Sequence, residues 1–110
     1  MKYSILTLVG AAACSLFLVT PSYAADPENG QKLARQCSVC HGRQGIAQDP
    51  EVPNLAGQSA FYLEKSLKDF REGVREDRRM TIVVRSLSDE DIADLAAWYE
   101  SFVVTVENPS

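Results

Sequence analysis

Two segments of the chain carry hydrophobic residues at the spacing of an amphipathic helix. Ser59 can cap the first helix, which we expect to run to about Glu72, and Gly73 suits the position after its last turn. Ser88 can cap the second, whose first turn is acidic and whose preceding residue, Leu87, can act as a hydrophobic staple. The predicted apolar positions are Phe61 or Tyr62, Leu63, Leu67 and Phe70 in the first helix, and Ile92, Leu95, Ala96, Tyr99 and Phe102 or Val103 in the second.

A third helix is predicted earlier in the chain. Asp26 can cap it, and Pro27 suits its first position because the N–H that proline lacks would be unpaired there. We expect this helix to run to about Cys40. Gly30 is a poor helix former, so it is either a tolerated glycine or a point where a second helix approaches closely. The predicted buried face comprises Leu33, Ala34 and Cys37.

The remaining segments have no regular pattern. Residues 42–58 contain three glycines and two prolines, which is typical of a loop. Residues 74–86 are charged and irregular, and the tail from residue 103 has β-prone valines but no partner strand. No segment shows a convincing strand pattern, so we expect an all-α domain.

The first 24 residues have the layout of a secretory signal peptide. Lys2 is followed by an uncharged, mostly apolar stretch of 15 residues, and Ser22 and Ala24 place small residues before a cleavage site. A retained membrane anchor is the alternative, but the apolar stretch is shorter than the about 20 residues that span a membrane. A lipoprotein cleaved at Cys14 would keep an apolar stub. We therefore expect residues 1–24 to be removed and residues 25–110 to form one periplasmic domain.

The net charge and the length of the chain limit the classes of function that it can have. The chain has 110 residues with 11 basic and 15 acidic side chains, a net charge of −4 that argues against nucleic-acid binding. Cleavage after Ala24 leaves 86 residues and a net charge of −5, because Lys2 is lost. A basic redox partner would suit this charge through electrostatic steering. A domain this small also benefits from an additional source of stability, such as a bound cofactor.

The segment Cys37-Ser38-Val39-Cys40-His41 matches the C-x-x-C-H motif of c-type haem attachment. Each thiol adds to one of two neighbouring vinyl groups, and two intervening residues on a helical turn match the separation of those groups. The next residue, His41, then points toward the iron as its proximal ligand. We therefore predict one covalent haem c, attached through both cysteines.

Three other interpretations of the motif are weaker. A plain disulfide would suit an exported protein but does not require the adjacent histidine. A thioredoxin-like redox pair belongs in a βαβ setting, which the pattern lacks. A structural zinc site needs four ligands, and residues 25–110 offer only Cys37, Cys40 and His41 among cysteines and histidines.

The sixth iron ligand is predicted to be Met80. His41 is the only histidine, so two histidine ligands from one chain are excluded. Met80 is the only methionine after cleavage, it lies in a polar segment, and 39 positions separate it from His41. Packing is the alternative role for a lone methionine. Ligation by histidine and methionine raises the reduction potential.

Several motifs together resemble the class I cytochromes c, in particular the small bacterial kind related to cytochrome c553 and to one half of the dihaem cytochrome c4. The resemblance covers residues 26–103. It rests on Gly30 with Leu33, on the segment from Cys37 to Gly42, on Pro53-Asn54-Leu55-Ala56-Gly57-Gln58, on Tyr62-Leu63 with Leu67, on Phe70 with Gly73, on Met80, and on Leu87 to Ile92 with Leu95 to Tyr99.

The resemblance implies three to four helices around one haem, with the first and last helices crossing. It implies that Gly30 lets the last helix approach closely near Leu95, Trp98 or Tyr99. It also implies that the Pro53 carbonyl accepts a hydrogen bond from the ligating histidine. Related sequences often carry a second methionine three positions after the axial one, where this chain has Val83.

Charged residues flank the predicted site. Arginines at positions 71, 75, 78, 79 and 85 are interleaved with acids and form either a solvated face or, through Arg78 or Arg79, a partner for a haem propionate. The acids Asp89, Glu90, Asp91 and Asp94 favour a role at a helix start over a docking patch.

These observations predict an electron carrier that transforms no substrate and has no catalytic residue. Two alternatives stay open: a dedicated electron-accepting subunit of a dehydrogenase or oxidase complex, and a gas-binding haem sensor. The expected partners are an unidentified electron donor and acceptor. We expect no stable membrane insertion of the processed chain, and a monomer or weak dimer.

Overall fold

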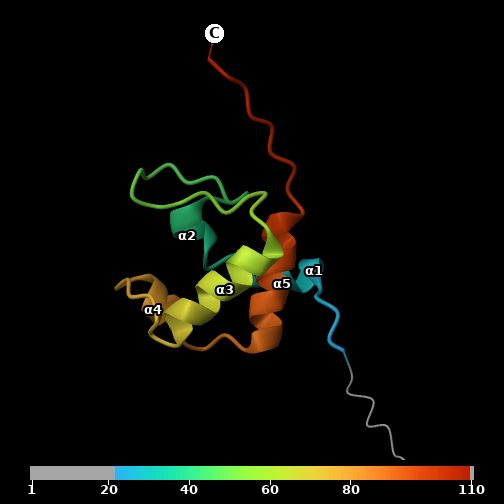
Figure 1. The fold of residues 1–110 in the computed structure, drawn as a ribbon, viewed down its shortest axis with the longest axis vertical. Coiled ribbons are helices and arrows are strands. Elements are labelled where there is room, and N and C mark those ends of the chain that lie inside the picture. Colours follow the sequence, from blue (N-terminus) through green and yellow to red (C-terminus); the bar gives the residue numbers. More distant parts are fainter. Residues whose placement is uncertain (1–21, 110) are drawn as a thin grey trace, which may run out of the picture.

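The computed structural model describes residues 22–109, so most of the predicted signal peptide lies outside the described residues. Within that range the secondary structure is helical and contains no strand, which confirms the all-α prediction. None of these helices is long and apolar enough to cross a membrane. The helices in chain order are α1 (Pro27–Leu33), α2 (Ser38–His41), α3 (Ala60–Arg71), α4 (Met80–Val84) and α5 (Asp89–Glu100) (Figure 1).

The two long helices begin where their capping residues predict. The Ser59 side chain accepts a hydrogen bond from the Tyr62 N–H at the start of α3. Ser88 and Asp91 form a reciprocal capping box at the start of α5, each side chain accepting from the other's backbone N–H at 3.0 Å. These bonds satisfy N–H groups that have no partner within a helix, so both starts are fixed locally.

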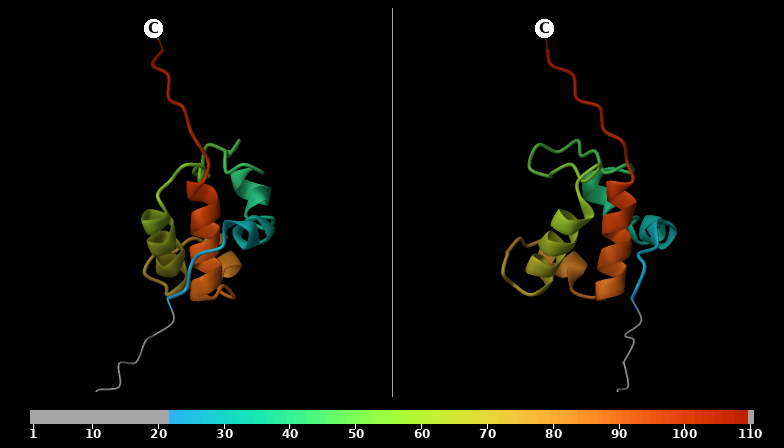
Figure 2. Two further views of the ribbon diagram at one scale, coloured as in Figure 1. Left: turned by 90° about the vertical axis from the view of Figure 1, so that its right-hand side faces the viewer. Right: turned by 45° about the vertical axis from the view of Figure 1, so that its right-hand side comes forward.

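Helices α1 and α5 cross in close contact, as Figure 2 shows, and Gly30 lies at that contact. A Cβ atom on Gly30 would lie 2.0 Å from the Asp94 carbonyl oxygen and 2.9 Å from Trp98 Cβ. This confirms the close approach expected at Gly30 and places it at Asp94 and Trp98. Any larger residue would push the two helices apart.

The single helix predicted from Pro27 to Cys40 is wrong, because the chain breaks into α1 and α2. The Ala34 carbonyl accepts from the N–H groups of both Cys37, at 3.0 Å, and Ser38, at 2.9 Å. This turn separates two short helices. The break lets α1 lie against α5 while α2 carries the cysteine–histidine motif elsewhere.

The segment 74–86, predicted to be irregular, contains the short helix α4. The side chain of Asp77 accepts hydrogen bonds from the N–H groups of Arg79, at 2.8 Å, and Met80, at 3.0 Å. Val84 at the end of α4 is fully buried in the core. A local turn at Asp77 and tertiary burial of Val84 therefore stabilise a helix that its β-branched sequence disfavours.

The core forms where α3, α4 and α5 meet. Leu63 and Phe70, both predicted, form the buried face of α3. Of the alternatives predicted for the remaining positions, Phe61 and Val103 are 82% and 96% exposed and Tyr62 is 50% exposed, whereas Phe102 is partly buried with its ring 4.9 Å from that of Trp98. The buried hydrophobic residues are Ala34, Leu63, Phe70, Val84, Leu87, Ile92, Leu95, Ala96 and Tyr99.

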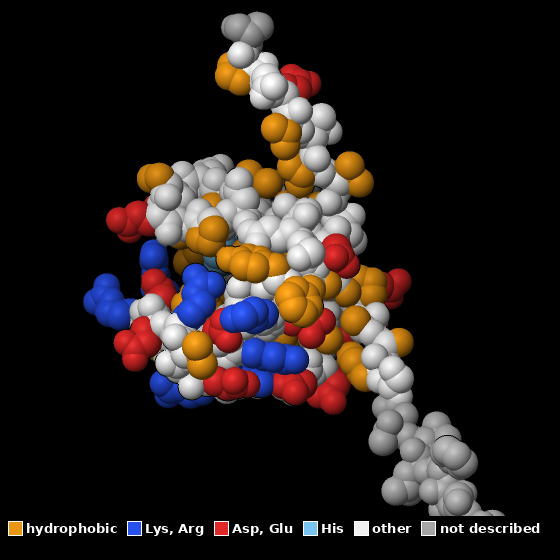
Figure 3. Space-filling model, in the orientation of Figure 1, with side chains coloured by type: hydrophobic (Ala, Val, Ile, Leu, Met, Phe, Trp, Pro, Cys, Tyr) orange, Lys and Arg blue, Asp and Glu red, His pale blue; other side chains and the backbone are white. Residues whose placement is uncertain are grey.

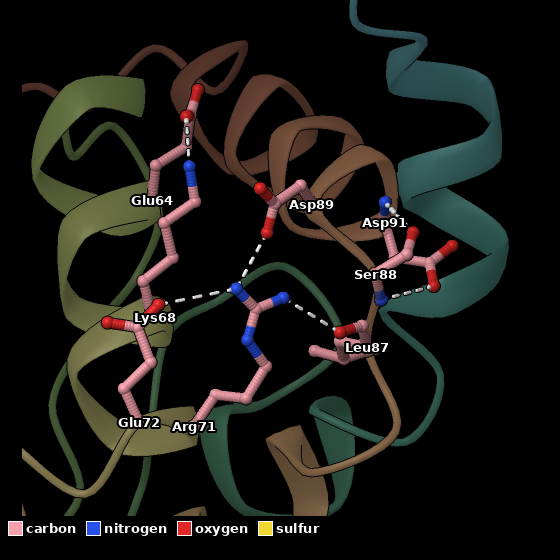
Figure 4. Close-up of polar contacts among 8 residues, drawn as sticks. All are labelled: Glu64, Lys68, Arg71, Glu72, Leu87, Ser88, Asp89 and Asp91. Carbon is pink, nitrogen blue, oxygen red and sulfur yellow. Dashed lines mark hydrogen bonds and ion pairs between the residues drawn. The ribbon is translucent and has the colours of Figure 1, made fainter.

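Arg71 joins the end of α3 to the start of α5, as the close-up in Figure 4 shows. It donates to the Leu87 carbonyl at 3.0 Å and to the Asp89 carboxylate at 2.6 Å. This hydrogen bond lowers the pKa of Asp89 below its ordinary value. Arg71 is therefore not part of a freely solvated face, as the sequence pattern allowed, but a link between two helices.

Asp94 also differs from its prediction as a helix-start acid. Its side chain is 1% exposed, and it accepts hydrogen bonds from residues that precede and begin α1. It therefore faces the crossing of α1 and α5 and not solvent.

Candidate functional site

The five predicted site residues border one cavity. It has a volume of about 490 Å³ and is lined by α2, α3, α4, α5 and the loop between α2 and α3. The residues Cys37, Cys40, His41, Pro53 and Met80 all contribute to its wall. Side chains separated by up to 43 positions thus meet at one place, and the cavity lies in the size range of cofactor sites.

The cavity wall is mostly apolar and also carries several charged side chains. Its charged residues belong to the segment before Val52 and to the segment between α3 and α4. They are Glu51, Arg75, Glu76, Asp77 and Arg79. The apolar side chains are those of Val52, Pro53, Leu55, Leu63, Leu67, Phe70, Met80, Val83, Leu95 and Ala96. This wall suits a large apolar group that carries charge at one edge.

The two cysteines stand one helical turn apart. The Cys37 carbonyl accepts from the Cys40 N–H at 3.2 Å and from the His41 N–H at 2.9 Å. Both cysteines are free thiols; Cys37 is partly buried and Cys40 is exposed. Burial raises the pKa of the Cys37 thiol. Two thiols thus border one cavity and are followed directly in the sequence by an imidazole.

His41 is held in one orientation by the backbone of Pro53. Its side chain is buried, and Nδ1 lies 2.8 Å from the Pro53 carbonyl oxygen. A carbonyl oxygen only accepts hydrogen bonds, so Nδ1 carries the proton and Nε2 of the neutral ring keeps its lone pair. This is the arrangement that prepares a histidine to bind a metal through Nε2.

The loop after α2 brings Pro53 back to His41. Gly42 ends α2 with a φ of 80°, and a Cβ there would lie 2.0 Å from the Ile46 carbonyl oxygen. Further along, the Gly45 carbonyl accepts from Leu55 at 2.7 Å and from Ala56 at 3.1 Å. Glycine at position 42 therefore allows the tight reversal on which the histidine–carbonyl contact depends.

Met80 reaches the cavity as the first residue of α4 and is partly buried against the core. The Asp77 carboxylate accepts hydrogen bonds from the backbone N–H groups of Met80 and Arg79. These two bonds lower the pKa of the Asp77 carboxyl. Asp77 is not among the residues predicted for the site. An aspartate three residues before Met80 is a local signal for such a turn.

Two arginines border the cavity, but only one was predicted. Arg79 lines it, whereas Arg78 does not. Arg75, which was not singled out, also lines it and lies 4.3 Å above the Phe70 ring centroid. In Figure 3 the Lys and Arg side chains on this face alternate with Asp and Glu over α3 and the segment before α4. A group with anionic substituents would find two guanidinium groups at the charged edge.

The residues present fit a haem. Two thiols, an oriented imidazole and a thioether face one apolar cavity, and these are the donor types that hold haem c. The Tyr99 hydroxyl borders the cavity, is buried and has no hydrogen-bond partner among residues 22–109. Burial raises the pKa of Tyr99, so the phenol remains an uncharged donor. Among residues 22–109 no three His, Cys, Asp or Glu side chains gather at metal-binding distance, so this part of the chain offers no zinc site of the usual composition.

The chain is similar to several known proteins. The family profile described as cytochrome c matches residues 27–102. Cytochrome c-554(548) of Halomonas halodenitrificans is 47% identical over 81 residues, which are 71% of this chain and 98% of that protein. A thiosulfate dehydrogenase electron acceptor of Stutzerimonas stutzeri is 36% identical over 104 residues, covering 86% of this chain and 46% of that protein.

A solved structure shares the fold. The crystal structure of reduced recombinant cytochrome c4 from Pseudomonas stutzeri matches with a TM-score of 0.70 and 37% identity, over 76% of this chain and 48% of that one. The chain thus spans nearly the whole of the Halomonas relative but less than half the length of the other two.

Proposed function

The chain belongs to the cytochrome c family, and from that membership we propose that it is a monohaem electron carrier with histidine and methionine as iron ligands. Family membership confirms the resemblance inferred from the motifs and the class I fold that it implied. When bound, the haem supplies an iron that accepts and gives up one electron by alternating between the ferric and ferrous states.

Each residue of the site has one role in the proposal. Cys37 and Cys40 would attach the haem through thioether bonds, and His41 and Met80 would bind its iron. Pro53 holds the His41 ring through its carbonyl and increases the basicity of the ligating nitrogen. Arg75 and Arg79 offer positive charge to the propionates. No catalytic residue is assigned, because every residue of the site binds or orients the cofactor.

The observation that carries the proposal is the arrangement at His41. The Pro53 carbonyl occupies Nδ1 at 2.8 Å, which leaves Nε2 as the free ligand nitrogen in a cavity that also contains Met80. A structural histidine of the core would not need two thiols within four positions and a thioether in the same cavity wall.

The processing and location of the chain belong to the same proposal. Residues 1–24 act as the export signal and residues 25–110 form the haem domain in the periplasm. The predicted cleavage after Ala24 would release the domain into the periplasm. We propose a monomer or weak dimer that exchanges electrons with a donor and an acceptor protein.

A second candidate follows from one relative. A protein named as a thiosulfate dehydrogenase electron acceptor is 36% identical, so a dedicated subunit of a dehydrogenase complex is the alternative function. Purification from the native cell distinguishes the two candidates. A stable complex of fixed stoichiometry favours the subunit, whereas a free haem protein favours the carrier.

The experiment that tests the proposal is expression with a c-haem maturation system, followed by intact mass and optical spectroscopy. We expect the mass of residues 25–110 plus one haem and a six-coordinate, low-spin spectrum. A haem-free mass with a Cys37–Cys40 disulfide would overturn the proposal. Rapid and complete carbon monoxide binding by the reduced protein at neutral pH would favour a gas sensor instead.

A further inference from the structure

A buried carboxylate on α5 accepts hydrogen bonds from the segment that precedes α1 and from the first turn of α1. Asp94 is 1% exposed and accepts three hydrogen bonds of 2.7 Å each. The donors are the Tyr23 hydroxyl, the Asp26 backbone N–H and the Asn29 side-chain amide. Figure 2 shows the chain before α1 running along α5, where these contacts form.

The three donors are neutral, although the acceptor carries a full charge. Burial by itself would raise the pKa of Asp94, but the hydrogen bonds from Asn29, Asp26 and Tyr23 outweigh it and lower that pKa. Asp94 is therefore an anion at neutral pH, and it has no ion pair with a lysine, arginine or histidine among residues 22–109. A buried anion without a cationic partner is well placed to bind one.

One of the three donors lies on the far side of the predicted cleavage site. Hydrolysis of the peptide bond between Ala24 and Ala25 adds one water, leaves a carboxylate on Ala24 and a free α-amine on Ala25, and removes Tyr23 with its hydroxyl. The α-amine of a protein chain is largely protonated at neutral pH. The reaction thus removes a neutral donor and creates a cation nearby.

The position of the new cation follows from the backbone. The Asp26 nitrogen lies 2.7 Å from Asp94 Oδ1. The nitrogen of the preceding residue lies about 3.5 Å further along the chain, so the new terminus falls within about 6 Å of the carboxylate. An opposite charge at this distance favours the charged form of both groups. Asp26 and Glu90 also face the position of Tyr23, and both are acidic, so they add to the attraction.

We propose that Asp94 is the internal binding site for the N-terminal ammonium group that export processing creates. The ammonium of Ala25 replaces the Tyr23 hydroxyl and forms an ion pair with Asp94 across the crossing of α1 and α5. Processing therefore strengthens the contact between the first and last helices. The proposal depends on cleavage after Ala24 and is independent of the haem ligands.

The test measures the pKa of the α-amine in the exported, haem-loaded protein. The titration is monitored by NMR of isotope-labelled alanine, with the protein in its reduced state. Intact mass first identifies Ala25 as the N-terminal residue. We expect the amine to titrate about one pH unit above its ordinary range of about 7.7 to 8.0. Asp94→Asn should return it to that range, whereas the matched control Asp91→Asn on the same helix should not.

A second variant keeps the test decisive if Asp94→Asn does not fold. Inserting Gly-Ser between Ala24 and Ala25 moves the new terminus about 7 Å along the chain while Asp94 and its other donors stay in place. The amine of this variant belongs to the inserted glycine and, followed with isotope-labelled glycine, should titrate in the ordinary range. An ordinary value in the unmodified protein, no response to either variant, or a mass showing that residues 1–24 are retained would overturn the proposal. The haem spectrum is unaffected by these outcomes, so this result and that of the proposed function are separate.

Discussion

At the scale of single residues, the site depends on hydrogen bonds that fix the two predicted ligand side chains. The Pro53 carbonyl holds Nδ1 of His41, and the Asp77 carboxylate holds the backbone at Met80. Neither Pro53 nor Asp77 has to contact the iron in order to act on the site. Both act by limiting the orientations that the ligand side chains can adopt.

Asp77→Ala should loosen Met80. The loss of a turn-capping carboxylate costs about 1 kcal/mol, which corresponds to a roughly fivefold larger fraction of protein with an open sixth position. The measurement is the rate of carbon monoxide binding to the reduced protein. Asp26→Ala is the matched control, since Asp26 also caps a local turn, at the Glu28 and Asn29 N–H groups, and does not line the cavity. Equal rates in both variants would contradict this role for Asp77.

At the scale of secondary structure, the crossing of α1 and α5 requires glycine at position 30. Gly30→Ala places a Cβ at 2.0 Å from the Asp94 carbonyl oxygen, so the helices must move apart, at a cost of about 3 kcal/mol in the free energy of unfolding. Gly73→Ala is the control. It has a φ of 77° but nothing within 4 Å, so only backbone strain of about 1 kcal/mol applies.

Chemical denaturation of both glycine variants measures this difference. A loss of stability for Gly30→Ala no greater than that for Gly73→Ala would show that the helices can separate at little cost, contrary to the packing described.

The link between α3 and α5 predicts a pH dependence. The hydrogen bond from Arg71 lowers the pKa of Asp89, so its stabilising contribution is present above the ordinary pKa of 3.8 and is lost as the pH falls through the folded value. Arg71→Gln should therefore make the free energy of unfolding fall less steeply between about pH 5 and pH 2. Lys65→Gln is the control, because Lys65 pairs with Asp69 within α3 alone. Identical pH profiles for Arg71→Gln and the unmodified protein would contradict the link.

Elements fixed by local contacts were predictable from the sequence, and those fixed by distant contacts were not. The Ser59 and Ser88 caps depend on neighbours within three residues, and both helix starts were found. The helix α4 depends on burial of Val84, and the role of Asp94 depends on residues 65 to 71 positions away. The same holds within the site: the cysteine–histidine motif is local, whereas the position of Arg75 at the cavity is not.

At the scale of the whole molecule, the helices of a small all-α domain surround a cavity. In a larger protein, hydrophobic side chains would fill this space. The short helices pack around that space, and the residues that close it come from α2, α3, α4 and α5. The covalent cofactor therefore completes the hydrophobic core as well as the redox site. This explains why the buried hydrophobic residues are few for the number of helices.

The net charge expected after the proposed cleavage predicts salt-dependent partner binding. At −5, the domain should attract a basic redox protein, and the rate constant for electron exchange should fall as ionic strength rises from about 10 to about 150 mM. Stopped-flow mixing with a basic small redox protein measures this, and an acidic one of similar size is the control, whose rate should rise. A rate that is independent of salt with both would show that the net charge does not steer association.

Spectroelectrochemical titration of the purified protein beside Met80→Ala tests the central claim most directly. We predict one reversible, one-electron transition with a low-spin spectrum in both oxidation states, and for Met80→Ala an open sixth position with a lower potential. The absence of a reversible one-electron transition, or a Met80→Ala variant with unchanged spectrum and potential, would contradict the assignment of His41 and Met80 as the ligands of an electron carrier.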